Sequence, residues 1–258
     1  RRAGDWFFPG RRWARAPALQ GSTLLVATFV SFETRDGNDE WIEMLIFVRK
    51  YTQYYPLKVH VSEEKAREAL SIFRKRGGLL RTSEARELGI HPRVLYHLRD
   101  TGQLETLSRG LYRVADLPPL SHRDLTVVAA RSDAVRICLI SALDFHDLTS
   151  EVPHAVDVAL PGNRRPPALD HPPIRTYLMS GEALTEGVKH HELGGADVKI
   201  FGPAKTVADC FKFRNRIGLD TALEGLRAYL EKGLGRTEDL MHYARICRVE
   251  SVLRPYVE

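Results

Sequence analysis

Residues 71–114 carry nine Lys or Arg side chains against four acidic ones, a balance of +5 on a short stretch of chain. The basic residues are Arg74, Lys75, Arg76, Arg81, Arg86, Arg93, Arg99, Arg109 and Arg113. Their cationic groups attract phosphate oxygens, and a positive field concentrated on a small segment is typical of nucleic-acid-binding proteins. A single surface arginine is usually only a solvated charge, so the interpretation depends on the elements that position these side chains.

The first two expected elements are helices with clear start and stop signals. A helix over 62–76 has Ser62 as its N-cap, and a Gly-Gly pair follows its last residue. A second helix of barely two turns starts with Thr82 or Ser83 as its cap and ends at a glycine. These two helices precede the one on which we expect the recognition chemistry.

A third helix is predicted over 92–101, with His91 as its N-cap and Pro92 at the first helical position, where the missing N–H costs nothing. Helical periodicity turns one apolar face inward, which consists of Val94, Leu95 and Leu98. The opposite face carries Arg93, Tyr96, His97 and Asp100, with Arg99 on its flank. Two strands follow over 104–107 and 111–114 and turn at 108–110. This order is that of a winged helix-turn-helix.

In that fold the third helix enters the major groove, and the wing runs along the backbone or into the minor groove. Arg93 stands at the exposed start of the helix, where its forked guanidinium suits guanine O6 and N7. Tyr96 and His97 suit base edges, a thymine methyl or a phosphate, and backbone N–H groups at a helix start suit phosphate. The predicted DNA-binding residues are Thr82, Ser83, Arg93, Tyr96, His97, Arg99, Arg109 and Arg113.

The rest of the chain predicts a larger mixed α+β domain after a proline-containing linker at 116–119. We expect helices at 121–131 and 135–147, strands at 155–160, 174–180, 187–193 and 196–201, and helices starting at 203, 220 and 237. The predicted order is an atypical extension over 1–60, a winged helix-turn-helix over 61–115 and a C-terminal domain over 120–258. Residues 1–43 are expected to be a poorly ordered tail or to lie upstream of the true start.

Charge and cysteine content narrow the class of protein. Residues 61–115 hold eleven basic and seven acidic side chains, whereas residues 116–258 hold eighteen and twenty, so the C-terminal block has no obvious attraction for phosphate. Cys138, Cys210 and Cys247 are too widely spaced for a metal pair or a disulfide framework, and buried free thiols in a reducing cytoplasm are expected. The longest apolar run is about half of a membrane span. We expect a cytoplasmic protein without cofactor or metal.

Enzymatic alternatives are weaker on the same residues. Asp157 on one predicted strand, with Asp197 and Lys199 on another, resembles the carboxylate and lysine set of a Mg²⁺-dependent nuclease targeted by a winged helix. The run Gly-Pro-Ala-Lys-Thr at 202–206 lacks the spacing of a phosphate loop and is better explained as a helix start. A winged helix used only for protein contacts is a third possibility, which the local charge of +5 disfavours.

The segment RTSEARELGIHPRVLYHLRDTGQLETLSRGLYRVAD (81–116) resembles the N-terminal winged helix of the AbiEi family, antitoxins of bacterial type IV toxin–antitoxin systems that also repress transcription. PAKTVADCFKFRNRIGLDTALEGLRAYL (203–230) is similar to that family's second domain. The resemblance implies a non-enzymatic repressor that binds double-stranded DNA in its own operon, on operators expected to be inverted repeats. It also implies antagonism of a nucleotidyltransferase-like toxin without a stable complex.

Overall fold

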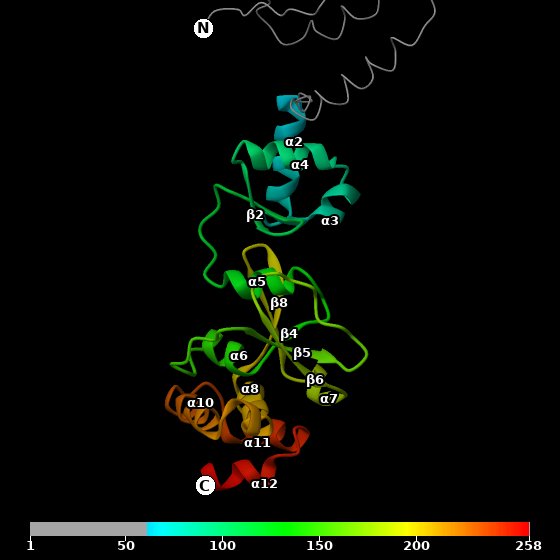
Figure 1. Ribbon diagram of the computed structural model, residues 1–258. Helices are drawn as coiled ribbons and strands as arrows, with labels where there is room; N and C mark the ends of the chain where they lie inside the picture. Colours follow the sequence, from blue (N-terminus) through cyan, green and yellow to red (C-terminus); the bar gives the residue numbers. More distant parts are fainter. Residues whose placement is uncertain (1–60, 258) are drawn as a thin grey trace, which may run out of the picture. The chain divides into compact units, whose positions relative to one another are not determined.

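The computed structural model describes residues 61–257 (Figure 1). The predictions for residues 1–60, namely the tail and the start site, lie outside the described residues. Within them the chain is a mixture of helices and two sheets, which confirms the α+β expectation at that level. No helix of the described part is long and apolar enough to cross a bilayer.

The first group of elements, residues 61–114, is called here the small-sheet region. It comprises α2 (Glu63–Lys75), β1 (Leu79–Arg81), α3 (Thr82–Glu87), α4 (Pro92–Asp100), β2 (Leu104–Ser108) and β3 (Leu111–Val114). Each predicted helix and strand of this stretch is present, with ends within a residue or two. Ser62 caps α2, because its side-chain oxygen accepts a hydrogen bond from the Lys65 N–H. Phe73 of that helix is fully buried against α4 and the strands.

The start of α3 differs from the prediction. Arg81, not Thr82 or Ser83, is the N-cap, and the Glu84 carboxylate accepts a 2.7 Å hydrogen bond from the Arg81 N–H. The Thr82 N–H donates to the Gly110 carbonyl at 2.9 Å, and the Thr82 hydroxyl donates to the same oxygen. The sequence could not show this, because the bond depends on the hairpin folding back over the helix start.

The three strands form an antiparallel sheet in the order β1-β3-β2. The β2–β3 hairpin turns tightly at Arg109 and Gly110, since Ser108 pairs with Leu111. Gly110 adopts φ +73°, a conformation that glycine takes without strain. β3 is the central strand, and all four of its side chains are buried. The apolar face of α4 packs with these strands in one cluster that also holds Ala66, Ala69 and Ile90.

The second group, residues 123–256, is called the large-sheet region. Its five strands lie in the order β6-β5-β4-β8-β7 and mix parallel with antiparallel pairs. They are β4 (Arg136–Ile137), β5 (Val156–Pro161), β6 (Ile174–Met179), β7 (Val188–Leu193) and β8 (Ala196–Phe201). The predicted glycine-pair turn joins β7 to β8, with Leu193 opposite Ala196.

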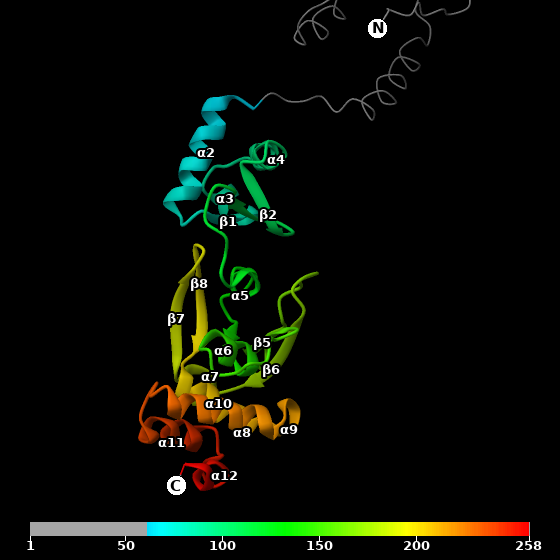
Figure 2. The ribbon, with the colours of Figure 1, turned by 90° about the vertical axis from the view of Figure 1, so that its left-hand side faces the viewer.

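Helices cover both faces of this sheet (Figure 2). On one face, α5 (Arg123–Ala129) packs on Val156, Val158 and Ile200. The other face meets α6 (Leu139–Phe145) and α8 (Pro203–Lys212), which are followed by α10 (Leu219–Glu231) and α11 (Thr237–Ile246). Three short helices complete the described elements: α7 (Glu182–Thr185), α9 (Arg214–Ile217) and α12 (Glu250–Leu253), the last followed by a 3-10 turn, Arg254–Tyr256.

The predicted helix over 135–147 is wrong in its first part. The chain there forms the two-residue strand β4 and then turns into α6 at Leu139, whose φ is +47°. The Cys138 N–H donates to the Asp157 carbonyl, which continues the pairing of β4 with β5 beyond the strand end. Apart from Arg136 and Ser141, residues 135–143 are apolar, and such a run fits a buried strand as well as a helix, so periodicity alone could not separate the two.

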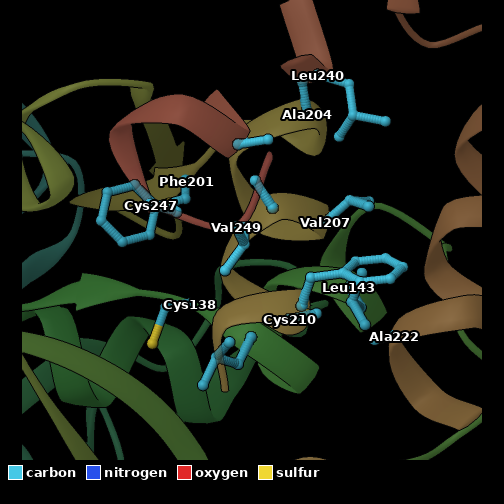
Figure 3. Close-up of a cluster of buried hydrophobic side chains, with 14 of the residues drawn as sticks. Cys138, Leu143, Phe201, Ala204, Val207, Cys210, Ala222, Leu240, Cys247 and Val249 are labelled. Carbon is cyan, nitrogen blue, oxygen red and sulfur yellow. The ribbon is translucent and has the colours of Figure 1, made fainter. Parts of the chain in front are cut away.

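The main core lies between the sheet and the C-terminal helices (Figure 3). Val207 and Cys210 of α8 meet Leu143, Ala222 and Leu240 from three other helices. All three cysteines are free and buried, as predicted. Burial raises the pKa of the Cys138 and Cys210 thiols well above the ordinary value, so both remain protonated at neutral pH.

The two regions share packed residues. Leu79, Leu107 and Leu111 of the small sheet belong to the same buried cluster as α5 and the strands β5 and β8. The backbones also meet closely, because a side chain at Gly195 would overlap the carbonyl group of Gly77. This approach explains the glycine at both positions.

Candidate nucleic-acid interface

The exposed face of α4 presents the three side chains predicted to read base edges. Arg93 is exposed, Tyr96 is 46% exposed although it is a large aromatic residue, and His97 is half-buried. The opposite face of the helix is buried and holds Val94, Leu95 and Leu98. The helical wheel therefore gave the correct facing of this helix.

His91 fixes where α4 begins. Its Nδ1 accepts a hydrogen bond from the Arg93 N–H at 3.2 Å, and Pro92 occupies the first helical position. The prediction that His91 is a capping residue is confirmed. Because the cap bonds directly to the backbone of Arg93, it orients the first residue of the candidate reading face.

Arg99 is engaged on the surface of the same helix. Its guanidinium donates two hydrogen bonds to Asp100 Oδ1, at 2.7 and 2.9 Å, and lies 5.2 Å from the centre of the Tyr96 ring. The hydrogen bond to Asp100 raises the pKa of Arg99. With one carboxylate already bound, Arg99 is better placed to hold the Tyr96 ring in position than to neutralise a phosphate.

Arg109 projects from the β2–β3 turn and is exposed. It lines a cleft of about 510 Å³ together with Arg131 and residues 168–171 of the large-sheet region. Arg131 is thus a basic residue near the hairpin that sequence reasoning missed. No local signal identifies it, because it follows α5 and comes near the turn only through folding.

Two of the predicted contact residues are engaged within the protein. Arg113 lies on the central strand, is only 4% exposed, and pairs with Glu105 at 2.6 Å and with the Pro118 carbonyl. Its charge is therefore used inside the protein and does not face a phosphate. The N–H of Thr82 is likewise occupied by Gly110, whereas Ser83 remains exposed at the start of α3.

The nuclease arrangement is not assembled. Asp157 on β5 and Asp197 on β8 are separated by strand β4, and no group of three potential metal-binding side chains occurs among residues 61–257. Asp157 is fully buried, whereas Asp197 is exposed and bonded to His190 at 2.9 Å. Lys199 donates to the Asp133 carbonyl. The three residues predicted as a set do not meet.

The Gly-Pro-Ala-Lys-Thr run is a helix start, as predicted. Gly202 is the N-cap of α8 and Pro203 its first residue. Lys205 is fully buried and bonded to Asp209 at 2.5 Å, so its ammonium group does not face a ligand at the protein surface.

A short helix with an exposed arginine and tyrosine and a half-buried histidine, next to a hairpin with an exposed arginine in its turn, is an arrangement of the kind that transcriptional regulators use. A family model described as "Transcriptional regulator, AbiEi antitoxin" matches residues 67–115. The match confirms the resemblance to the AbiEi family over the small-sheet region. No curated protein was found to match the chain.

Proposed function

We propose that the protein is a DNA-binding transcriptional repressor with antitoxin activity of the AbiEi type. The observation that carries the proposal is the family match over 67–115, the same residues that hold the exposed basic face of α4. In this proposal residues 61–115 act as a winged helix-turn-helix. Arg93, Tyr96 and His97 enter the major groove, and Ser83 and Arg109 contact phosphates.

The second part of the proposal concerns the operon. The protein represses its own promoter in the cytoplasm by binding inverted repeats, and residues 120–258 counter a nucleotidyltransferase-like toxin without forming a stable complex. These roles rest on the resemblance to the family. In this proposal the protein is not an enzyme, and its partner is double-stranded DNA rather than a membrane.

Titration of the full chain onto its own upstream DNA, in the presence of Mg²⁺, tests the function. We expect retarded but intact DNA, with affinity that falls as salt rises because cationic side chains displace counterions. Equal binding to unrelated DNA at every salt concentration would contradict a sequence-specific repressor. Cleavage of the DNA would overturn the non-enzymatic assignment.

Arg93→Ala is expected to weaken operator binding by about 1–3 kcal/mol and to relax the base preference at one position of each half-site, because a bidentate contact to guanine is lost. Binding to a panel of operators with single base changes measures this. Arg93→Lys is the matched control, since it keeps the charge and loses the fork. If the alanine variant retains full base preference, Arg93 does not read the DNA.

Arg109→Ala is expected to weaken binding to all sequences alike and to lower the slope of log affinity against log salt by about 1, because one phosphate contact disappears. Binding isotherms at several salt concentrations measure the slope. Arg227→Ala removes an exposed arginine of α10 and serves as the control of equal charge change. An unchanged slope for Arg109→Ala would place the hairpin outside the interface.

A further inference from the structure

Strand β6 forms one edge of the five-stranded sheet. It pairs with β5 along its whole length, from Ile174 to Met179, and no other strand of the described residues pairs with its outer side. A strand edge of this length presents backbone N–H and C=O groups to solvent, which favour pairing with another strand.

The two edges of the sheet differ in how they are protected. At the opposite edge, β7 exposes the polar side chains Lys189, His190 and Glu192, which discourage strand addition. The charged residue of β6, Arg175, is drawn toward Asp157 of the neighbouring strand, 3.5 Å away. The other exposed side chain of β6 is that of Leu178. The β6 edge therefore exposes one charged side chain, which is paired with Asp157, whereas the β7 edge exposes three polar side chains.

The most exposed large aliphatic side chains of the described residues lie at the two ends of β6. Leu178, near the end of the strand, is 61% exposed, and Val152 is 73% exposed. Val152 lines a cleft with Pro172 and Pro173, which immediately precede the strand. A two-fold axis through the centre of the strand would bring an apolar residue at one end of this free edge close to the apolar residue at the other end in a second copy.

We propose that β6 pairs antiparallel with β6 of a second copy of this chain, with Thr176 opposite Thr176. A two-fold axis perpendicular to the sheet keeps the same face of both sheets on the same side. Residues that pair across the axis therefore have side chains on the same face. This register sets Leu178 opposite Ile174 of the second copy, and Arg175 opposite Tyr177 of the second copy. Ile174, Thr176 and Leu178 lie on the face that α5 covers further into the sheet, since they pair with Val156, Val158 and Leu160.

The register explains the exposure of Leu178. Ile174 is half-buried at the border of the core, and the cross-strand contact extends that apolar face onto the partner. Val152, beside the start of one strand, approaches the end of the other, where Leu178 of the second copy lies. The antiparallel pair about a two-fold axis closes as a dimer, because it uses the outer edge of β6 on both copies.

Thr176→Cys in the full chain tests the register directly. Opposed side chains of an antiparallel pair have Cβ atoms about 4.5–5.5 Å apart, close to the separation that a disulfide requires. The three native thiols are buried, so the new cysteine is the accessible one. We expect mild oxidation to give a covalent dimer of Thr176→Cys, with none from Lys189→Cys on the opposite edge.

Sedimentation of the unmodified chain and of Leu178→Asp tests the surface independently of DNA binding. We expect twice the chain mass for the former and a folded monomer for the latter, with a circular dichroism spectrum that matches the parent. A parent chain that stays monomeric, or that cross-links equally through Lys189→Cys, would overturn the proposal. So would a monomer whose Thr176→Cys thiol resists maleimide, since another part of the chain would then cover the edge.

Discussion

Lys205→Met is expected to lower the free energy of unfolding by about 3–5 kcal/mol, because it leaves the Asp209 carboxyl buried without its partner. Lys205 and Asp209 are both fully buried and lie one helical turn from each other on α8. The distance between Lys205 Nζ and Asp209 Oδ2 is 2.5 Å. Burial raises the pKa of Asp209, and the Lys205 ammonium opposes that rise. Without the lysine, the carboxyl must take up a proton or remain charged among apolar side chains.

The pair also ties α8 to its neighbours. The Cys247 thiol, which follows α11, donates to the other Asp209 oxygen at 3.1 Å, and the Lys205 ammonium lies 4.2 Å from the centre of the Phe201 ring. Figure 3 shows Phe201 and Cys247 within the same buried cluster. Loss of the lysine therefore disturbs β8, α8 and the end of α11 together.

Urea denaturation at neutral pH measures the loss. The double variant Lys205→Met/Asp209→Leu is the matched control, since replacing both charges by apolar groups is expected to be close to neutral or stabilising. In the single variant, stability should fall further as pH rises, because the buried carboxyl is then forced to ionise. A double variant as unstable as the single one would assign the loss to packing rather than to the unpaired charge.

Helical periodicity predicted α8 well, and the same periodicity hid its buried pair. Val207, Ala208 and Phe211 recur at helical spacing, which located the helix and its start at Pro203. Lys205 and Asp209 are also one turn apart, a spacing that signals a side-chain pair on any helix. Sequence alone does not show that both faces of α8 are covered, so the pair was not expected in the core.

In the candidate interface, too, burial that depends on pairing between distant strands could not be predicted from the sequence. The exposed residues of α4 follow from the position of its apolar face, which is a local property of the sequence. The burial of Arg113 does not, because it depends on β1 pairing with β3 from the side opposite β2. A hairpin taken by itself predicts an exposed arginine there. The third strand, β1, which precedes α3 and α4 in the chain, makes the position internal.

Asp157→Asn is expected to raise the free energy of unfolding at pH 8 by up to about 3 kcal/mol and to leave it nearly unchanged at pH 4. Burial raises the pKa of Asp157 from 3.8 to about 6, although Arg175 and the Ile140 and Ser141 amides favour the charged form. The folded protein thus binds this proton more tightly than the unfolded chain. Stability from this group is full below about pH 4 and is lost as pH rises through 6.

Urea denaturation of both proteins between pH 4 and pH 8 measures the effect, and Asp197→Asn is the control. Asp197 is an exposed carboxylate on the same sheet, so its replacement should change stability by less than about 1 kcal/mol. A difference for Asp157→Asn that stays constant with pH would show that shape, not ionisation, is responsible. Asp157 is fully buried and separated from Asp197 by strand β4, which is the physical reason why the strand aspartate does not form the predicted Mg²⁺ site with Asp197 and Lys199.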